Sequence, residues 1–325
     1  MIRLVAGVLA AAVTLALPAV LDDSALAVYI LLGLAAMVTV GVSLLMGYAG
    51  QVSLGQGAFY AVGAYTAALL ALNGVPPLAG LVAAPVAAAL FAVVIGLPLL
   101  RLRGHHLAFA TLATQLILLS LAGQLEFTGG DIGLQAIPQF GVGSVEFGDA
   151  AAYAYLTWFG VAVVMLLTHN VITSRPGRAL RALATSETAA ASAGIPVGRY
   201  KLTVFALSAA FAGLAGGVYC FYTGYVAPGS FPVLISIQYI VMAVVGGLGT
   251  IWGAVAGAAA ITLLVQGLDQ LAGLPGMPSY APSVLSYAVY ALVLIVVVLF
   301  LPQGLVPALT GRLSRTRTDP PVETR

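Results

Sequence analysis

Long apolar runs fill most of the chain, and short polar stretches separate them. An α-helix needs ~20 mostly apolar residues to cross the hydrocarbon layer of a bilayer. The runs therefore predict about ten membrane spans, near residues 4–20, 27–46, 52–71, 78–100, 107–123, 153–172, 202–222, 232–247, 250–271 and 284–301. The run at 232–247 is short, as expected of a half-helix. We expect an all-α fold: a polytopic transmembrane helical bundle that includes broken or half-helices.

The overall composition supports a membrane protein. Of the 325 residues, 61% are hydrophobic and 7% are charged, whereas soluble domains carry charge at roughly a quarter of their positions. A membrane β-barrel would alternate apolar and polar residues over ~10-residue segments, and here the apolar runs are unbroken. Residues 1–306 are expected to form one membrane domain, followed by a polar, proline-containing tail at 307–325.

The charged residues divide between the two sides of the predicted bundle. If the N-terminus is cytoplasmic, all 12 Lys and Arg residues fall on the cytoplasmic side, and the loops on the opposite side hold acidic residues without a basic one. This distribution follows the positive-inside rule and predicts that both termini are cytoplasmic. Arg3, the first apolar run and Ala25-Leu26-Ala27 also resemble a cleaved signal peptide. Cleavage would leave the other spans and their orientation unchanged.

Several kinds of chemistry lack the residues that they need. The sequence has no G-x-x-x-x-G-K-[ST] phosphate loop and no H-E-x-x-H zinc motif. Its one cysteine, Cys220, lies within an apolar run. No acidic or basic residue lies at the centre of a predicted span, where proton-driven carriers keep theirs. We therefore expect a non-enzyme without cofactor, metal or nucleic-acid partner, and any solute that it moves should be net neutral and driven by a partner.

Uncharged polar residues interrupt the predicted spans at three places: Gly47–Phe59 ("GYAGQVSLGQGAF"), the pair Thr111 and Gln115, and residues 236–239. The pair is spaced i, i+4 and so shares one helix face. Such residues point into the bundle or a wet cavity, either to contact a solute or to join helices, and a broken helix also offers free backbone groups. The glycines at 213–217 are typical of close helix packing. The candidate substrate-pathway residues are Tyr48, Gln51, Ser53, Gln56, Thr111, Gln115 and Gln238.

The largest loop on the basic side, residues 173–201, predicts a helix that lies along the membrane surface. Its Ala-rich middle, from about Ala179 to Ala193, favours a helix. Pro176-Gly177 should break the chain before this helix, and Gly194 with Pro196 should end it. The loop is either a connector anchored to lipid headgroups or a docking helix for a cytoplasmic partner, with polar contacts from Arg181 and Glu187.

The stretch "SETAAASAGIPVGRYKL" at 186–202 resembles the coupling loop of ATP-binding-cassette importer permeases, and more closely the branched-chain amino-acid permease family. The R-L-R-G and T-G-G segments resemble its M-type permease. Six further stretches resemble that family, in its order, between about residues 33 and 306: "GYAGQVSLGQGAFYAVGAYTAALL", "LPLLRLRGHHLAFATLA", "EFTGGDIGL", "FALSAAFAGLAGGVY", "VVGGLGTIWGAVAGA" and "LFLPQGL".

The resemblance implies a permease subunit that moves branched-chain or other neutral amino acids into the cell across a bacterial cytoplasmic (inner) membrane. It implies as partners a second, H-type permease, two cytoplasmic ATP-binding subunits and a periplasmic or extracellular amino-acid-binding protein, besides membrane lipid. The alternatives are a standalone carrier or facilitator for a small neutral solute, an importer of urea or short amides, and a scaffold without transport. Coupling to the ATPase would run through Arg181, Glu187, Ala189, Ala190 and Gly194.

The loop from Gln124 to Ala152 is the longest on the acidic side, and it carries no basic residue. It would form part of the surface that meets the binding protein, or it is an ordinary acidic loop. Its candidate docking residues are Thr128, Gly129, Gly130 and Asp131.

Overall fold

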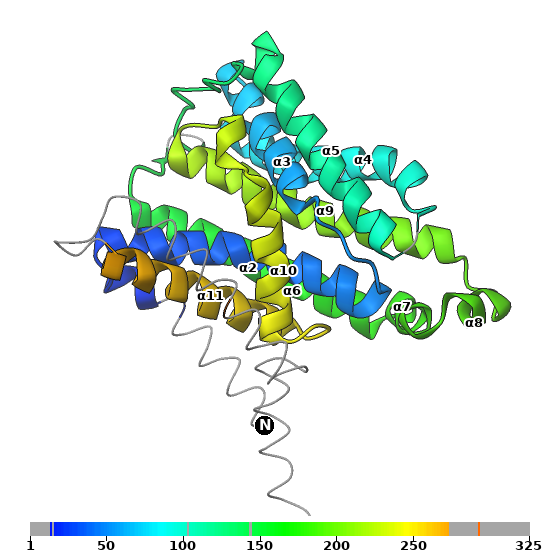
Figure 1. The fold of residues 1–325 in the computed structure, drawn as a ribbon. Coiled ribbons are helices and arrows are strands. Elements are labelled where there is room, and N and C mark those ends of the chain that lie inside the picture. Colours follow the sequence, from blue (N-terminus) through cyan, green and yellow to red (C-terminus); the bar gives the residue numbers. More distant parts are fainter. Residues whose placement is uncertain (1–13, 15, 103, 143–144, 273–291, 293–325) are drawn as a thin grey trace, which may run out of the picture.

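The computed structural model describes residues 14, 16–102, 104–142, 145–272 and 292. Long helices make up most of this part of the chain (Figure 1). One small antiparallel hairpin lies between η2 and α6. In chain order the elements are η1 (Leu17–Ala19), α2 (Asp23–Ala49), α3 (Gln56–Leu72), α4 (Pro77–Leu99), α5 (His105–Gln124), η2 (Glu126–Thr128), β1 (Gly141–Val142), β2 (Val145–Glu146), α6 (Ala150–Thr173), α7 (Arg175–Thr185), α8 (Glu187–Ser192), α9 (Val197–Thr223), η3 (Pro228–Ser230), α10 (Val233–Gly246) and α11 (Ile251–Ala272).

The apolar runs correctly predicted the spans that fall within the described residues. Helices α2 to α6 and α9 to α11 coincide with eight of the ten predicted segments. The segments at 4–20 and 284–301 lie mostly outside the described residues. Within the described residues, seven helices are long and apolar enough to cross a membrane, and α3, with 17 residues, is shorter. These findings confirm the polytopic helical bundle.

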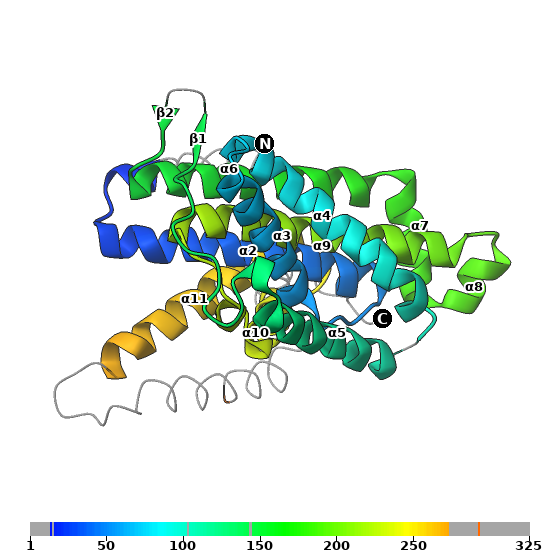
Figure 2. The ribbon, with the colours of Figure 1, turned by 90° about the horizontal axis from the view of Figure 1, so that it is seen from above.

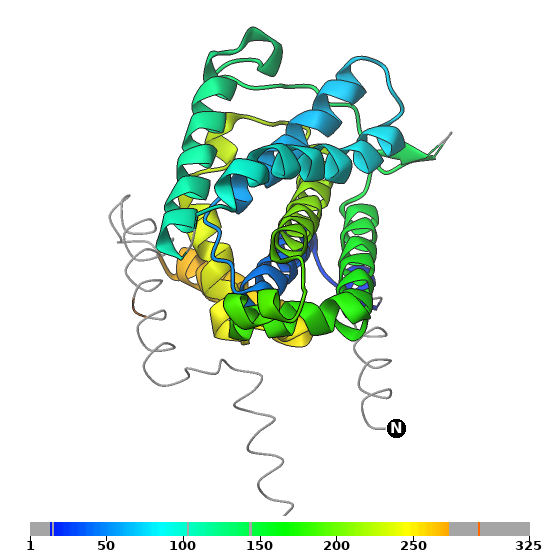
Figure 3. The ribbon, with the colours of Figure 1, turned by 90° about the vertical axis from the view of Figure 1, so that its right-hand side faces the viewer.

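Helices α2 and α9 form the core of the bundle. The most apolar window of α2 is 78% buried and that of α9 is 72% buried, whereas the corresponding windows of α4 and α5 are each 28% buried. Viewed nearly end-on in Figure 3, α9 lies in the middle, and the other helices surround it. Seen from above, α4 lies over α9 (Figure 2), whereas α2 and α6 lie below α9 in Figure 1. The outer helices therefore expose apolar faces, as expected of a protein that faces lipid.

Glycines allow the backbones of α3 and α9 to touch. A Cβ atom added at Gly216 would collide with the carbonyl oxygen of Tyr60, and one added at Gly63 would collide with the backbone of Gly213. Membrane helices use small residues in this way because close approach gains van der Waals contact where no hydrophobic effect separates helix from lipid. The packing role predicted for the glycines of α9 is confirmed.

The loop expected to hold one helix over 179–193 holds two, α7 and α8. Ser186 separates them, with extended backbone angles of φ −159° and ψ 117°, and its hydroxyl accepts a hydrogen bond from the N–H of Ala189 at 3.3 Å. Pro176 and Gly177 do not break the chain before the helix; they lie in the first turn of α7, where a proline costs no hydrogen bond. The predicted end at Gly194 is correct, because this residue adopts a left-handed φ of 78°.

Charge distinguishes the two ends of the bundle. We call the end with α7 and α8, at the right of Figure 1, the basic end, and the end with the hairpin and η2 the acidic end. At the basic end lie Arg101, Arg175, Arg178, Arg181, Arg199 and Lys201. At the acidic end lie Asp22, Asp23, Glu126, Asp131 and Asp149.

Candidate functional site

The stretch between α2 and α3 leaves the helical conformation inside the bundle. Gly50 ends α2 with a left-handed φ of 63°, and the N–H of Gln51 reaches back to the carbonyl oxygen of Leu45 at 3.1 Å. Regular helix resumes only at Gln56, so the first residues of the span predicted at 52–71 are not helical. Gly50 permits this turn because a residue with a Cβ atom rarely adopts the left-handed conformation.

Hydroxyl groups from two other helices satisfy the backbone at the start of α3. The N–H of Leu54 donates to Thr111 Oγ1 on α5 at 2.9 Å, and the N–H of Gly57 donates to Ser236 Oγ on α10 at 2.8 Å. Ser236 in turn donates to Gln115 Oε1 at 2.7 Å. We call Leu54, Gly57, Thr111, Gln115 and Ser236 the polar seam. The prediction that Thr111 and Gln115 share a buried face is confirmed. The broken helix was expected to offer free backbone groups, but the N–H groups of Leu54 and Gly57 are hydrogen-bonded.

Glycine is required where the seam is tightest. A Cβ atom at Gly57 would collide with the side-chain amide of Gln115, and one at Gly55 would lie 2.8 Å from the carbonyl oxygen of Thr111. Gln115 also donates from Nε2 to the carbonyl oxygen of Phe231 at 3.3 Å. The seam therefore ties α3, α5 and the η3–α10 connection together through hydrogen bonds between uncharged groups.

Two glutamines beside the seam carry amide atoms that have no hydrogen-bond partner among the described residues. Gln56 is fully buried; its Nε2 donates to Ser208 Oγ on α9 at 3.2 Å, and its Oε1 has no partner among the described residues. Gln51 is 3% exposed, and within the same part of the chain neither of its amide atoms has a partner. A buried polar group left unsatisfied costs about 1–3 kcal/mol. Both amide atoms of Gln51 and the Oε1 atom of Gln56 are therefore the polar atoms at this site that are free to bind a solute in the described part of the chain.

The other three predicted pathway residues, Ser53, Gln238 and Tyr48, do not present free polar groups beside these amides. Ser53 is buried, and its hydroxyl accepts from the N–H of Gly55 at 3.4 Å. Gln238 is half-buried on α10 and takes no part in the hydrogen bonds of the seam. Tyr48 belongs to the basic end, because its hydroxyl donates to the carbonyl oxygen of Gly249 at 2.7 Å. The sequence did not single out Ser208, a small residue in a glycine- and alanine-rich helix.

At the basic end, α7 lies against the break between α2 and α3. The Cζ atom of Arg181 lies 6.0 Å from the centre of the Tyr48 ring, within the range of a cation–π contact. Arg181 also donates from Nη2 to the carbonyl oxygen of Ile172 at 2.7 Å. The N–H of Gly249 donates to Ser43 Oγ on α2 at 3.2 Å. The end of α2, the α10–α11 turn and α7 thus form one connected group.

The α8 segment connects to α9 through an ion pair. Glu187 accepts a hydrogen bond from Lys201, which is the only lysine in the sequence and is 6% exposed. Ala190 is buried, whereas Ala189 is exposed and Gly194 has open space around its Cα. The sequence placed Lys201 at the start of a span but gave no signal that Glu187 is its partner.

At the acidic end, the four predicted docking residues differ in what they present. Thr128 is 6% exposed and turns inward, since its hydroxyl lies 2.6 Å from the carbonyl oxygen of Ala122 and 2.7 Å from that of Leu125. Gly129 and Gly130 both adopt positive φ and form the turn. Asp131 is exposed. Asp131 is thus the member of this set whose side chain faces outward.

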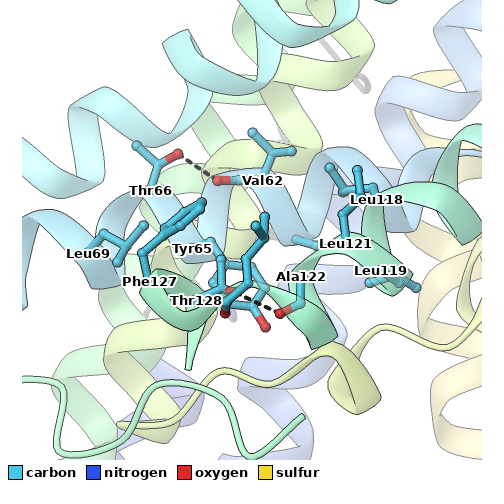
Figure 4. A pocket seen from close by; sticks show the side chains of 12 residues that line it. Val62, Tyr65, Thr66, Leu69, Leu118, Leu119, Leu121, Ala122, Phe127 and Thr128 are labelled. Atoms are coloured by element: carbon cyan, nitrogen blue, oxygen red, sulfur yellow. Dashed lines mark hydrogen bonds between the residues drawn. The ribbon is translucent and has the colours of Figure 1, made fainter. Parts of the chain in front are cut away.

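An apolar groove of about 270 Å³ lies apart from the seam, between α3, α5 and η2 (Figure 4). Its walls are aliphatic and aromatic, with Val62, Leu118 and Phe127 among them. The hydroxyl of Tyr65 is buried there without a partner among the described residues. Because this groove presents few polar groups, it suits an apolar chain better than a zwitterion. The glutamines beside the seam are the stronger candidate site for a polar solute.

Comparison with known proteins agrees with this architecture. Residues 23–298 match the family model of the branched-chain amino acid transport system permease component. The high-affinity branched-chain amino acid transport system permease proteins LivM of Escherichia coli and Salmonella typhimurium are each 35% identical to the chain over 269 residues. The probable branched-chain amino acid transport permease protein LivM of Methanocaldococcus jannaschii is 25% identical over 249 residues.

The matches cover 74% of this chain in each case, 60% of the two bacterial proteins and 72% of the archaeal one. The chain thus spans about 60% of the length of the two bacterial relatives. No solved structure matches. The family match covers well over half of the chain and agrees with its apolar helices, so the chain belongs to the branched-chain amino acid transport system permease family and is a multi-pass membrane protein.

Proposed function

We propose that this chain is the membrane-spanning subunit of an ATP-binding-cassette importer that moves branched-chain or other neutral amino acids into the cell. Separate subunits would hydrolyse ATP. The observation that carries the proposal is the pair of buried, uncharged amides of Gln51 and Gln56 at the break between α2 and α3. An amino acid with an aliphatic side chain is a zwitterion without net charge, and amide and backbone dipoles can solvate it without a fixed charge.

The bundle would be oriented with its basic end in the cytoplasm of a bacterial cell and its acidic end outside the inner membrane. The supporting observation is the separation of basic from acidic residues between the two ends, which is the positive-inside pattern. In this orientation both termini are cytoplasmic. An amino-acid-binding protein would dock at the acidic end, where Asp131 is exposed.

Two ATP-binding subunits and a second permease would complete the importer. One ATP-binding subunit would meet α7 and α8, with Ala189 and Gly194 presented to it and Arg181, Glu187 and Ala190 holding the surface in shape. Motion of α7 would reach the break through the contact of Arg181 with Tyr48, and the α10–α11 turn through the bond from Tyr48 to Gly249. This chain of contacts runs from the proposed docking surface to Tyr48, three residues before Gln51.

In the conformation described, the amides of Gln51 and Gln56 are closed off from water. An importer alternates between conformations, and ATP drives the cycle by favouring one of them. We expect an open conformation in which water and the amino acid reach these amides and supply the hydrogen bonds that they lack. Opening would then recover about 1–3 kcal/mol per satisfied group.

Thiol labelling of a Gln51→Cys variant within the assembled importer tests this site. The native thiol, Cys220, is fully buried, so background labelling should be low. We expect a hydrophilic maleimide to label the variant in one nucleotide state of the importer and not in the other, and leucine to protect it. Leu34→Cys, at an apolar buried position of α2, should stay unlabelled in both states. Equal labelling of Gln51→Cys in all states would contradict a gated pathway at this residue.

A further inference from the structure

A groove lies between α4 and α9 at the basic end of the bundle. The proposed transport function does not involve this groove. The groove has a volume of about 330 Å³ and is lined by Gly96, Leu97, Leu100, Arg101, Gly198, Arg199 and Leu202. Its lining is apolar except for Arg101, which follows the end of α4, and Arg199, which lies in the first turn of α9. We call the part of the groove with these two arginines its mouth. Both arginines are exposed.

The two arginines carry positive charge that no acidic residue in the described part of the chain neutralises. Within the described residues, neither guanidinium forms an ion pair or a side-chain hydrogen bond, and no acidic residue lines the groove. The carboxylate of Glu187 is already bound to Lys201, two residues after Arg199. Charge complementarity therefore favours an anion at the mouth, held between guanidinium groups from two different helices.

A second groove lies further along the same pair of helices. It has a volume of about 290 Å³ and is lined by Pro85, Val86, Ala89, Leu90, Val93 and Ala210, all apolar. On α4, residues 86, 90, 93, 97 and 100 follow each other at spacings of three and four, so the two grooves share one face of that helix. From Pro85 to Leu100 this face extends over about 20 Å at 1.5 Å per residue.

We propose that this face binds one anionic phospholipid, with its phosphate between Arg101 and Arg199 and an acyl chain along the apolar groove toward Pro85. The order of charged mouth and apolar groove matches the order of headgroup and acyl chain. Basic pockets between membrane helices on the cytoplasmic side are the usual place for anionic headgroups. Val86, Leu90 and Leu97 are each more than half exposed, so their apolar surface is available to a chain. The site is independent of which solute the importer moves.

Native mass spectrometry of the full-length chain tests the site, with added phosphatidylglycerol and with phosphatidylcholine of the same acyl chains. We expect the double variant Arg101→Gln/Arg199→Gln to lower the affinity for phosphatidylglycerol about 25-fold, to the level of phosphatidylcholine, because each of the two arginines near an anionic lipid contributes roughly fivefold. The matched control is Arg175→Gln/Arg178→Gln, which removes the same charge from exposed positions of α7 that line neither groove. This control should keep the preference.

Two further arms distinguish a lipid from other occupants. Ala89→Phe, which fills the apolar groove without changing charge, should weaken the binding of both lipids, and excess inorganic phosphate should not displace phosphatidylglycerol. Equal loss in both arginine double variants would mean general surface attraction and overturn the proposal. Displacement by phosphate would mean a soluble-anion site, and loss of the second permease from the purified complex of Arg101→Gln/Arg199→Gln would mean a protein interface. Either result would also overturn it.

Discussion

At the residue scale, a substitution of Gln51 distinguishes a role in transport from a role in helix packing. A side chain that joins helices is hydrogen-bonded to them, and neither amide atom of Gln51 has a partner among the described residues. We therefore expect Gln51→Leu to leave the thermal unfolding temperature unchanged or slightly higher, since an unsatisfied buried group is replaced by an apolar one of similar size. Leucine uptake by the assembled importer should fall at least tenfold.

The matched control for that variant is Gln238→Leu, on the half-buried side of α10. It should change neither the unfolding temperature nor uptake appreciably. If Gln51→Leu lowered both stability and membrane abundance in proportion to uptake, its amide would serve packing instead. Gln56→Leu is a less clean test because it also removes the bond to Ser208.

Ser236 should be the most sensitive residue of the polar seam. Its hydroxyl both accepts from the N–H of Gly57 and donates to Gln115. Ser236→Ala leaves two buried groups without partners, and we expect a loss of about 1–3 kcal/mol in unfolding free energy. Thr66→Ala, which removes only a bond to Val62 within its own helix, should have a much smaller effect in the same denaturation experiment. Similar effects of the two variants would refute the seam as a structural link.

Sequence periodicity predicted which side of a helix is buried, but not which side chains hydrogen-bond to each other. The i, i+4 spacing correctly placed Thr111 and Gln115 on one buried side of α5. It could not indicate that Ser236 would meet Gln115, or that Ser208 would meet Gln56, because those pairs are brought together by the packing of helices 121 and 152 residues apart in sequence. The sequence therefore predicts which residues suit a membrane passage, but it does not predict which of them hydrogen-bond to one another.

At the element scale, the ion pair of Glu187 and Lys201 holds α8 against α9. The two side chains of this pair differ in their exposure to solvent. The side chain of Lys201 is 8% exposed and that of Glu187 is 38% exposed. We expect Glu187→Gln to destabilise the protein more than Lys201→Gln, because it leaves a buried charge without a partner, while a lone Glu187 can be hydrated. Thermal unfolding of both variants and the double variant measures this order. Equal losses would mean that the pair is no more than a solvated contact.

The exposed alanine of α8 offers a test of coupling. Ala189→Glu adds a charged side chain on the outer surface of α8, whereas a change at Ala190 would disturb buried packing as well. We expect Ala189→Glu to lower ATP-dependent uptake at least tenfold while the chain inserts and unfolds normally, and Ala189→Ser to behave like the wild type. Unchanged uptake in Ala189→Glu would mean that the ATP-binding subunit does not dock at this surface.

The sequence predicted the long helices better than the short ones. A run of ~20 apolar residues has few alternatives in a bilayer, since every backbone group must be bonded within the segment. In the basic-end loop, alanine propensity favoured one continuous helix, but Ser186 offers its own hydroxyl as an N-cap and starts a new one. Competition between propensity and a local cap is decided by tertiary contacts, here the burial of Leu180, Leu183 and Ala190.

At the scale of the whole molecule, three features lie together: a break inside the bundle, buried amides with unsatisfied atoms beside it, and a basic end that contacts the break. The path runs from α7 through Arg181 and Tyr48 to Gly249 and the ends of α2 and α11. The apolar runs and the charge asymmetry predicted the spans and the two ends. The path itself could not be predicted, because Tyr48 and Gly249 are far apart in sequence.

Uptake of labelled leucine into proteoliposomes tests the central claim most directly. We predict that leucine enters only when this chain is combined with the second permease, both ATP-binding subunits, the binding protein and ATP, and that this uptake is lost in Gln51→Leu although the complex still assembles. If this chain alone moved leucine at the same rate without ATP or partners, it would be a facilitator, and the importer account would be contradicted.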